Sequence, residues 1–280
     1  ENLYDNYDEL KYNIGYVPQE DIVYSNLTLH DTLQYAAKLR MPDNTTIKER
    51  NIRIKEVLDI VKLTELENSY IRQLSGGQRK RASIAVELIA DPNLFFLDEP
   101  TSGLDPGTER SIMLTLRKMA EMGKTVILVT HNTLNLHLCD KVAFFGKGGK
   151  LCFFGRPKQA LEFFGVSDFV DIYTLLNKDV EPWYNKFKNI EQTVNIEEAG
   201  EERTKINKKN KSFFRQLMIL ISRYIKLITN DFQQLFLLIA QAPVVAILLA
   251  MVASDDIYTS YDDTKAIIFS IGCASIWLGL

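Results

Sequence analysis

The sequence predicts an α/β domain with a mostly parallel sheet over residues 1–165, followed by the start of an all-α transmembrane domain over residues 212–280. In the first part, short apolar runs of strand length alternate with amphipathic helical patterns. A stretch rich in lysine and arginine, residues 203–226, comes later in the chain. The third observation is the uncharged run Leu235–Ala253, which with Phe232 and its neighbours reaches the ~20 residues that a bilayer-spanning helix needs.

The elements of the first part are expected to alternate between strands and helices before a final hairpin. Residues 13–18, "NIGYVP", form the first strand candidate. Thr28 or Asp31 is expected to cap the helix that follows, because a side-chain oxygen there can accept from a free backbone N–H. The run Asn93–Leu97 has the continuous apolar composition of a strand buried on both faces. The other expected elements are helices over residues 47–63 (with Ile52, Val57, Leu58 and Val61 facing inward), Gln78–Ala90 and Gly107–Met122, and strands over Thr125–Thr130, Lys141–Phe145 and Lys150–Phe154.

Composition excludes several classes of function. The net charge of −3 gives no indication of a nucleic-acid partner. Cys139, Cys152 and Cys273 form no C-x-x-C pair, so neither a zinc site nor a disulfide framework is expected, and the cysteines fit a reducing cytosol. His30 and His137 match no motif and are expected to be ordinary structural histidines. The first residues lack signal-peptide character and an initial Met, so we expect the natural chain to begin upstream.

The second part of the chain has the pattern of a membrane protein. Residues 166–211 are charged and aperiodic, and we expect a linker there. A first span is expected at about residues 232–253 and a second from about residue 266, where the chain's end interrupts it. Gln241 and Pro243 leave open a buried core helix in place of the first span, although packed membrane helices tolerate both residues. The positive-inside rule then predicts a multi-pass membrane protein whose N-terminal domain is cytoplasmic. The basic residues before the first span are Arg203, Lys205, Lys208, Lys209, Lys211, Arg215, Arg223 and Lys226, whereas the loop after it carries only Lys265.

The sequence contains no phosphate-binding loop. The pattern G-x-x-x-x-G-K-[ST] should lie between a strand and a helix. Gly123, Lys124 and Thr125 match its second half, but Lys118 stands where the first glycine belongs, and an apolar strand follows where a helix is needed. The sequence "GKGGK", residues 146–150, fails on spacing as well.

Two carboxylates follow the apolar run of the second expected strand. Asp98 and Glu99 would lie at the carboxyl end of that strand, where open α/β sheets bind their ligands. Adjacent strand residues point to opposite faces, so one carboxylate can partner a metal ion while the other activates water. For the Asp-Glu pair on its own, a solvated strand end is the alternative.

The pentapeptide "LSGGQ" makes the nucleotide interpretation specific. The glycines let the backbone approach an anion, and the helix expected after them points its positive N-terminus at the same place. A plain glycine-rich turn is the alternative for "SGG" alone. The same pentapeptide followed by a helix and then an apolar strand ending in Asp-Glu is a rare combination. The residues concerned are Ser75, Gly76, Gly77 and Gln78.

Together these segments resemble a known family. "LSGGQ", "LFFLDEPTSGLD" and "ILVTH" are similar to the signature motif, Walker B with D-loop, and switch histidine of ABC-transporter nucleotide-binding domains, and Gln19 in "YVPQED" matches the Q-loop. Order and separations agree over residues 13–154. The resemblance implies a P-loop NTPase-type ABC nucleotide-binding domain that is incomplete here, because the Walker A part is missing. In the family that part precedes the Q-loop, so we expect it upstream of Glu1 and expect this fragment alone to be inactive.

The resemblance also implies the roles of individual residues, with ATP and Mg²⁺ as the cofactors. Each ATP would lie between two nucleotide-binding domains. Asp98 and Gln19 would bind Mg²⁺, Glu99 would be the catalytic base, His131 would contact the γ-phosphate, Asp105 would belong to the D-loop at the dimer interface, and Ser75, Gly76, Gly77 and Gln78 would bind the ATP held by the partner.

A nucleotide-binding domain that leads through a basic helix into membrane spans resembles the G-type (White-like) half-transporters of the ABC-2 type. The resemblance implies ATP-driven export by a dimer of half-transporters in a lipid bilayer. "PGTE" after Asp105 departs from the usual G-type wording. The transported substrate is not indicated, nor is whether the two half-transporters are identical.

Two other classes of protein carry related motifs. A soluble ABC-type ATPase of translation or DNA repair would lack the run Leu235–Ala253. A non-hydrolysing scaffold without a P-loop would be expected to lose Glu99 or Ser75 as well, and both are present. The transporter interpretation therefore accounts for more of the sequence than either alternative.

Overall fold

The structure is a computed structural model that describes residues 13–191, 213–252, 265, 268–269 and 271–272. The chain divides into two compact units, Glu1–Gln216 and Leu217–Leu280, and each is described by itself. The fold is mixed α/β, as predicted.

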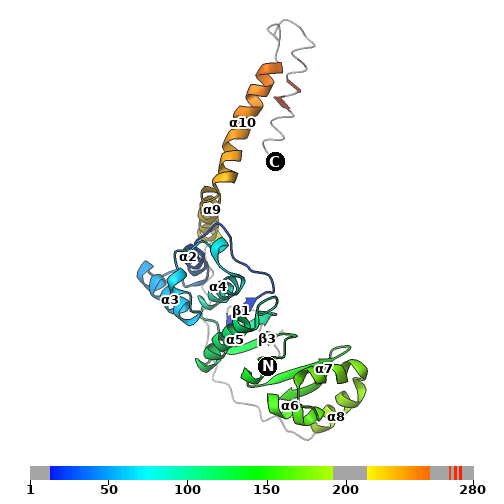
Figure 1. Ribbon diagram of the computed structural model, residues 1–280. Helices are drawn as coiled ribbons and strands as arrows, with labels where there is room; N and C mark the ends of the chain where they lie inside the picture. Colours follow the sequence, from blue (N-terminus) through cyan, green and yellow to red (C-terminus); the bar gives the residue numbers. More distant parts are fainter. Residues whose placement is uncertain (1–12, 192–212, 253–264, 266–267, 270, 273–280) are drawn as a thin grey trace. The chain divides into compact units, whose positions relative to one another are not determined.

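A three-stranded parallel sheet forms the centre of the first unit (Figure 1). Its strands are β1 (Ile14–Val17), β2 (Leu94–Asp98) and β3 (Thr125–Val129), in that spatial order. All three run parallel, and helices form the connections between them. The carboxyl ends of the three strands therefore meet at one edge of the sheet.

The two faces of this sheet differ in burial. Phe95 and Leu97 of β2 are fully buried among the core residues. On the opposite face, Tyr16 and Ile127 flank Phe96 in register and remain 52% and 44% exposed. The expectation that the strand "NLFFL" is buried on both faces is therefore wrong for the described part of the chain. The described residues cover the face of Phe96 only in part.

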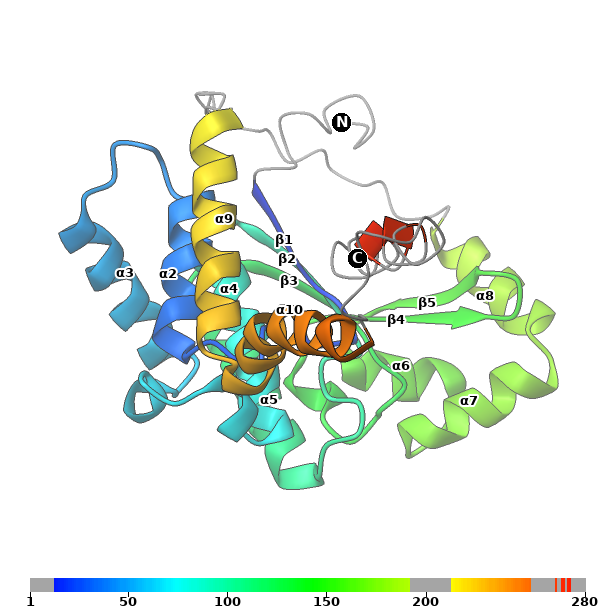
Figure 2. The same cartoon turned by 90° about the horizontal axis from the view of Figure 1, so that it is seen from above.

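Four long helices pack around the buried face and beside it (Figure 2). Of the two caps predicted for the first helix, Thr28 is the one used, and its Oγ1 accepts from Asp31 N at 3.1 Å. In the second helix, Ile47–Ile60, the residue that faces the core is Ile54 and not Ile52, whose side chain is 48% exposed. Two residues turn a helix by about 200°, so these two side chains cannot share a face. The helices are α2 (Leu29–Arg40), α3 (Ile47–Ile60), α4 (Gly76–Leu88) and α5 (Pro106–Glu121), with short 3₁₀ helices at Thr64–Leu66, Ile71–Gln73 and Leu136–Leu138.

A second hydrophobic cluster forms around an antiparallel hairpin. Phe144 and Phe153 of the hairpin are buried with Phe164. The rings of Phe144 and Phe164 pack edge to face, with their centroids 5.9 Å apart. In Figure 2, helices α6 and α7 lie on one side of the hairpin and α8 lies beside its outer end. The elements of this part are β4 (Val142–Gly146), β5 (Lys150–Gly155), α6 (Pro157–Phe164), α7 (Phe169–Lys178) and α8 (Glu181–Glu191).

Helices α7 and α8 occupy a range that was expected to be irregular linker. Ile172 and Leu176 of α7 are buried in the second cluster, and Trp183 of α8 packs against it. The spacing of Ile172 and Leu176 is helical, but the charged composition of residues 166–211 as a whole led to the expectation of a linker. The irregular structure expected for residues 166–191 is therefore wrong, while residues 192–211 lie outside the described residues.

The last long helices are α9 (Phe213–Thr229) and α10 (Phe232–Val252). Pro243 lies inside α10. Among the described residues, no helix has both the length and the apolar character required to cross a bilayer. Most of the segment expected as a second span, from about residue 266, lies outside the described residues.

Candidate functional site

Side chains from three separate segments meet at the carboxylate of Glu99. Gln19 follows β1, Glu99 follows β2 and His131 follows β3. The Nε2 of Gln19 donates to Glu99 Oε2 at 3.4 Å, and His131 Nδ1 lies 3.0 Å from Glu99 Oε1. The structure thus brings together three of the predicted site residues, which are up to 112 positions apart, at the edge where parallel sheets bind ligands.

The site is accessible to a reactant. The side chain of His131 is 70% exposed and that of Glu99 28% exposed. A carboxylate in contact with an imidazole and an amide, open to solvent on one side, can accept a proton from a water molecule. The residue types and contacts around Glu99 are those that a general base needs.

Glu99 has an unusual backbone conformation. Its φ of +41° lies in the left-handed region, which costs a residue other than glycine about 1–3 kcal/mol. The N–H of Glu99 donates to Val129 O at 2.9 Å, and its carbonyl accepts from Ser102 N at 3.1 Å. These two hydrogen bonds hold the strained turn, which directs the chain out of the sheet directly at the carboxylate.

Asp98 is the last residue of β2 and pairs in register with Val129. Among the described residues, no group of three or more His, Cys, Asp or Glu side chains surrounds a metal position. Asp98 and the amide oxygen of Gln19 would provide two oxygen ligands at most. This number fits Mg²⁺, which in nucleotide sites takes one or two protein ligands and completes its octahedron with phosphate oxygens and water.

The signature segment caps its own helix. Ser75 Oγ accepts from Gln78 N at 3.3 Å, and Gln78 Oε1 accepts from Ser75 N at 2.8 Å. This reciprocal capping box engages the side chain of Gln78, which was predicted to bind nucleotide. The remaining free N–H groups at the start of α4 keep the positive end of the helix available to an anion.

The two glycines of this segment have different neighbours: Gly76 lies beside Leu104 of the D-loop, and Gly77 lies beside Thr108 of α5. A Cβ on Gly76 would lie 3.5 Å from Leu104 Cδ2, which is an ordinary contact. A Cβ on Gly77 would lie 2.1 Å from Thr108 Cγ2, which is impossible without movement. Gly77 is therefore needed for the packing of α4 on α5, a role that the sequence did not indicate.

Asp105 also has a capping role. Its Oδ1 accepts from Gly107 N and Thr108 N, each at 3.0 Å, at the start of α5. Hydrogen bonds from the Thr108 side chain and from these backbone groups hold the pKa of the Asp105 carboxyl below its usual value. The carboxylate thus faces its own helix and shapes the loop Thr101–Asp105.

One functional candidate was missed in the sequence. Glu109 of α5 is only 2% exposed, and its carboxylate accepts from Asn135 Nδ2 at 2.9 Å and from Asn132 Nδ2. Both asparagines belong to the loop that begins with His131. Glu109 continues the buried stripe of Ile112, Met113 and Leu116 at helical spacing, and an acidic residue in such a stripe is a signal that could have been noticed.

We expect Glu109→Gln to lower the free energy of unfolding by about 1–3 kcal/mol. The new amide group would point a donor at an asparagine donor and leave one buried hydrogen bond unmade. Urea unfolding measures the change. The control is Glu121→Gln in the same helix, whose side chain is 61% exposed and which should change stability by less than about 0.5 kcal/mol. Equal effects of the two substitutions would contradict this role for Glu109.

Comparison with known proteins agrees with this geometry. Residues 1–102 match the family described as ABC transporter. The chain is 35% identical to the ABC transporter ATP-binding/permease protein Rv1747 of Mycobacterium tuberculosis, over 91% of the chain and 30% of that protein. It is 41% identical to the broad substrate specificity ATP-binding cassette transporter ABCG2 of Bos taurus, over 57% of the chain and 25% of the transporter. It is also 41% identical to ABC transporter G family member 22 of Arabidopsis thaliana, over 55% of the chain and 21% of that protein.

The chain therefore spans less than a third of the length of each of these relatives. The matched residues 1–102 include Gln19, the signature segment and the two carboxylates at the end of β2, Asp98 and Glu99. The chain thus matches the ABC transporter family over residues 1–102 and is similar to ATP-binding cassette transporters of the G type over more than half of its length.

Proposed function

We propose that the full-length protein hydrolyses ATP to transport a substrate across a membrane, as one half of an ABC transporter dimer. The observation that carries this proposal is the convergence of Gln19 and His131 on the carboxylate of Glu99. A general base needs hydrogen-bond reach to the water that it activates and a partner that orients it. Glu99 has two orienting partners and an open side.

In this proposal Glu99 accepts a proton from the water that attacks the γ-phosphate. His131 contacts the γ-phosphate oxygens from the exposed side of the site. Asp98 and Gln19 hold Mg²⁺, which when bound neutralises charge on the phosphates. Residues of this chain thus provide the base, the metal ligands and one phosphate contact.

The second half of each site comes from a partner protomer. Ser75, Gly76 and Gly77 present the N-terminus of α4 to the γ-phosphate of the ATP that the partner holds, and the positive end of the helix favours that negative charge. Asp105 shapes the D-loop at the same interface. The proposal assigns the β- and γ-phosphate cradle to a P-loop outside this sequence.

The membrane part of the proposal is based on the distribution of charged residues along the chain and on what the relatives are named. We propose that residues 232–253 form the first span of a multi-pass domain, with the ATP-binding domain in the cytoplasm. Lysines and arginines cluster before this segment, which supports that orientation. The relatives are named as a permease protein and as transporters, which supports transport, and we propose export as the direction and a second half-transporter as the partner.

The test is Ser75→Arg in the full-length protein. A large cation at the start of α4 should stop the two domains from closing on ATP, and we expect the hydrolysis rate to fall on the order of 100-fold, as when an anion-binding donor is lost. Steady-state phosphate release and size-exclusion chromatography with ATP report rate and association.

The control is Ser75→Thr, which keeps a hydroxyl able to cap α4. It should retain ATP-dependent association and most of the rate. A normal rate in Ser75→Arg would mean that the signature segment does not contact nucleotide. Absence of any ATP hydrolysis by the unsubstituted full-length protein would refute the proposed function itself.

A further inference from the structure

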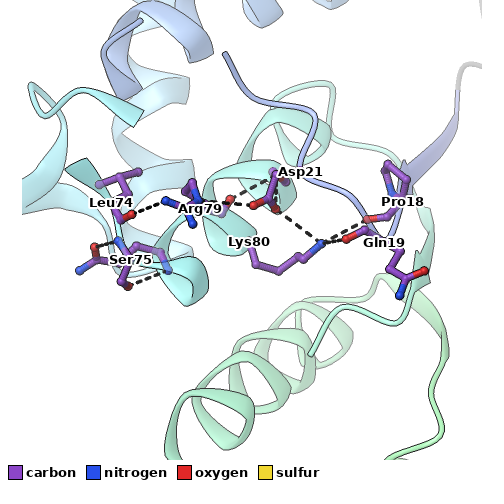
Figure 3. A network of polar contacts seen from close by, with 9 residues as sticks. Pro18, Gln19, Asp21, Leu74, Ser75, Arg79 and Lys80 are labelled. Carbon is purple, nitrogen blue, oxygen red and sulfur yellow. Dashed lines mark hydrogen bonds and ion pairs between the residues drawn. The ribbon is translucent and has the colours of Figure 1, made fainter. Parts of the chain in front are cut away.

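Lys80 is a buried lysine that the proposed site does not use. It lies on α4 five residues after Ser75 and is 6% exposed. Its Nζ donates to the backbone carbonyl of Gln19 at 2.6 Å and to that of Pro18 at 3.3 Å (Figure 3). An ammonium group buried at this depth is stable only when its hydrogens have partners, and here two of the partners are backbone carbonyls of a loop.

Asp21 provides the third partner of this ammonium group. Its Oδ1 lies 3.5 Å from Lys80 Nζ and accepts from Ser83 Oγ at 3.4 Å, while its Oδ2 lies 3.7 Å from Arg79 Nε. Three side chains within little more than one turn of α4 therefore contact one side chain of the loop. Figure 3 shows Lys80 between α4 and the loop Pro18–Asp21.

Arg79 extends the same network to the signature segment. Its Nη1 donates to the carbonyl of Leu74 at 2.8 Å, directly before Ser75. The loop that carries Gln19 and the residues that begin α4 are thus connected through Arg79, which contacts both Leu74 and Asp21.

The loop itself is exposed on its outer side. Residues 19–22 are all solvent-exposed, and they lie beyond the last pairing of β1. Ladder hydrogen bonds therefore do not fix the backbone of Gln19. The hydrogen bond from Lys80 Nζ holds the backbone carbonyl of Gln19 on the side that faces α4. The side chain of Gln19 points to the site, where its Nε2 lies 3.4 Å from Glu99 Oε2.

We propose that Lys80 is a positioning residue that fixes the loop Pro18–Asp21 to α4, so that the amide of Gln19 is held at the site of Glu99 and moves together with the signature segment. The proposal rests on the proposed function for its consequence in ATP hydrolysis. In that function, the start of α4 serves the ATP of the partner and Gln19 serves the ATP of its own protomer. Lys80 thereby links the two composite sites of a dimer within a single chain.

The first experiment measures how firmly the loop is held, in the full-length protein without nucleotide. Glu20 is exposed in the loop and is a native cleavage site for a glutamyl endopeptidase. Lys80→Met keeps the apolar stem but removes the ammonium group, and we expect cleavage after Glu20 to become at least about 10-fold faster, because proteolysis follows local opening. Cleavage after Glu65, an exposed residue of the Thr64–Leu66 helix, should stay unchanged.

Two variants serve as controls for the chemistry of the side chain. Lys80→Arg keeps N–H donors for the two carbonyls and should restore most of the resistance to cleavage. Lys118→Met is the same substitution at an exposed position of α5 and should have no effect. If Lys80→Met does not fold, Asp21→Asn weakens the network from the exposed loop and should give a smaller increase in cleavage after Glu20.

The second experiment measures the Mg²⁺ concentration that gives half-maximal ATP hydrolysis. Loss of an outer-shell partner typically costs 10–100-fold in metal affinity or activity. We expect Lys80→Met to raise this concentration on the order of 10-fold, and Lys80→Arg to return it towards the original value. A residue that served stability alone would change the melting temperature without changing this concentration.

Unchanged cleavage after Glu20 in a folded Lys80→Met variant would overturn the proposal, as would an equal increase after Glu65. Faster cleavage after Glu20 without a change in the Mg²⁺ concentration for half-maximal hydrolysis would show that Lys80 holds the loop but does not position Gln19 for ATP hydrolysis. If the unsubstituted protein hydrolyses no ATP, the proposed function fails, and the cleavage experiment still decides whether Lys80 holds the loop.

Discussion

Glu99→Gln in the full-length protein is expected to lower the rate of ATP hydrolysis by on the order of 10²–10⁴-fold, the range that general-base catalysis contributes. The substitution keeps the shape of the side chain and one oxygen acceptor for Gln19 or His131, but it removes the group that takes the proton. Binding of ATP between two protomers does not require that proton transfer. We therefore expect ATP-dependent association to persist, and to last longer because the nucleotide is not consumed.

Single-turnover hydrolysis of radiolabelled ATP and size-exclusion chromatography measure the two effects separately. Glu121→Gln is the matched control, since Glu121 is an exposed glutamate that pairs with Arg117 and contacts none of the three site residues in the hydrogen bonds described above. A rate within a few-fold of the unsubstituted protein in Glu99→Gln would remove Glu99 from the role of base.

The backbone at this position provides a second comparison. Because Glu99 has a φ of +41°, glycine is the one residue that adopts its conformation without strain. Glu99→Gly should therefore be as inactive as Glu99→Gln, and yet should unfold at no lower urea concentration. Inactivity together with retained stability would separate the chemical role of the side chain from the strain in the turn.

Gly77→Ala is expected to destabilise the domain by about 1–3 kcal/mol, the usual effect of overpacking. The added Cβ would meet Thr108 Cγ2 at 2.1 Å, so α4 and α5 must separate or Thr108 must rotate. Helix propensity alone favours alanine by about 1 kcal/mol, so a net loss of stability would show that the steric effect outweighs it.

Thr108→Ser provides the rescue, because it removes only the methyl group and keeps the hydroxyl that hydrogen-bonds to Asp105. Urea unfolding of the two single variants and the double variant measures the coupling between the positions. Gly76→Ala is the matched control, since its Cβ would lie at an ordinary 3.5 Å from Leu104. Strictly additive effects of Gly77→Ala and Thr108→Ser would contradict the contact.

The sequence by itself determined the features that depend on local patterns. The alternation of strands and helices, a cap at either Thr28 or Asp31, and the parallel sheet follow from periodicity and from the groups left free at a helix end. The position of Glu99 at the ligand-binding edge also follows, because it comes directly after an apolar strand of a parallel sheet. Gln19 and His131 were predicted only through the resemblance to ABC-transporter nucleotide-binding domains, and the structure brings both to Glu99.

Only the tertiary structure decided which side chains connect elements that are far apart along the chain. Lys80 and the carbonyl of Gln19 are separated by 61 positions, and Glu109 and Asn135 by 26, and no periodic pattern indicates such pairs. No periodic pattern indicates the contact between the methyl group of Thr108 and Gly77 either. Nor does one indicate the second hydrophobic cluster, which stabilises α7 in a range that was expected to be a linker. Periodicity reports which face of an element is apolar, whereas the partner of each face is determined by how the whole chain packs.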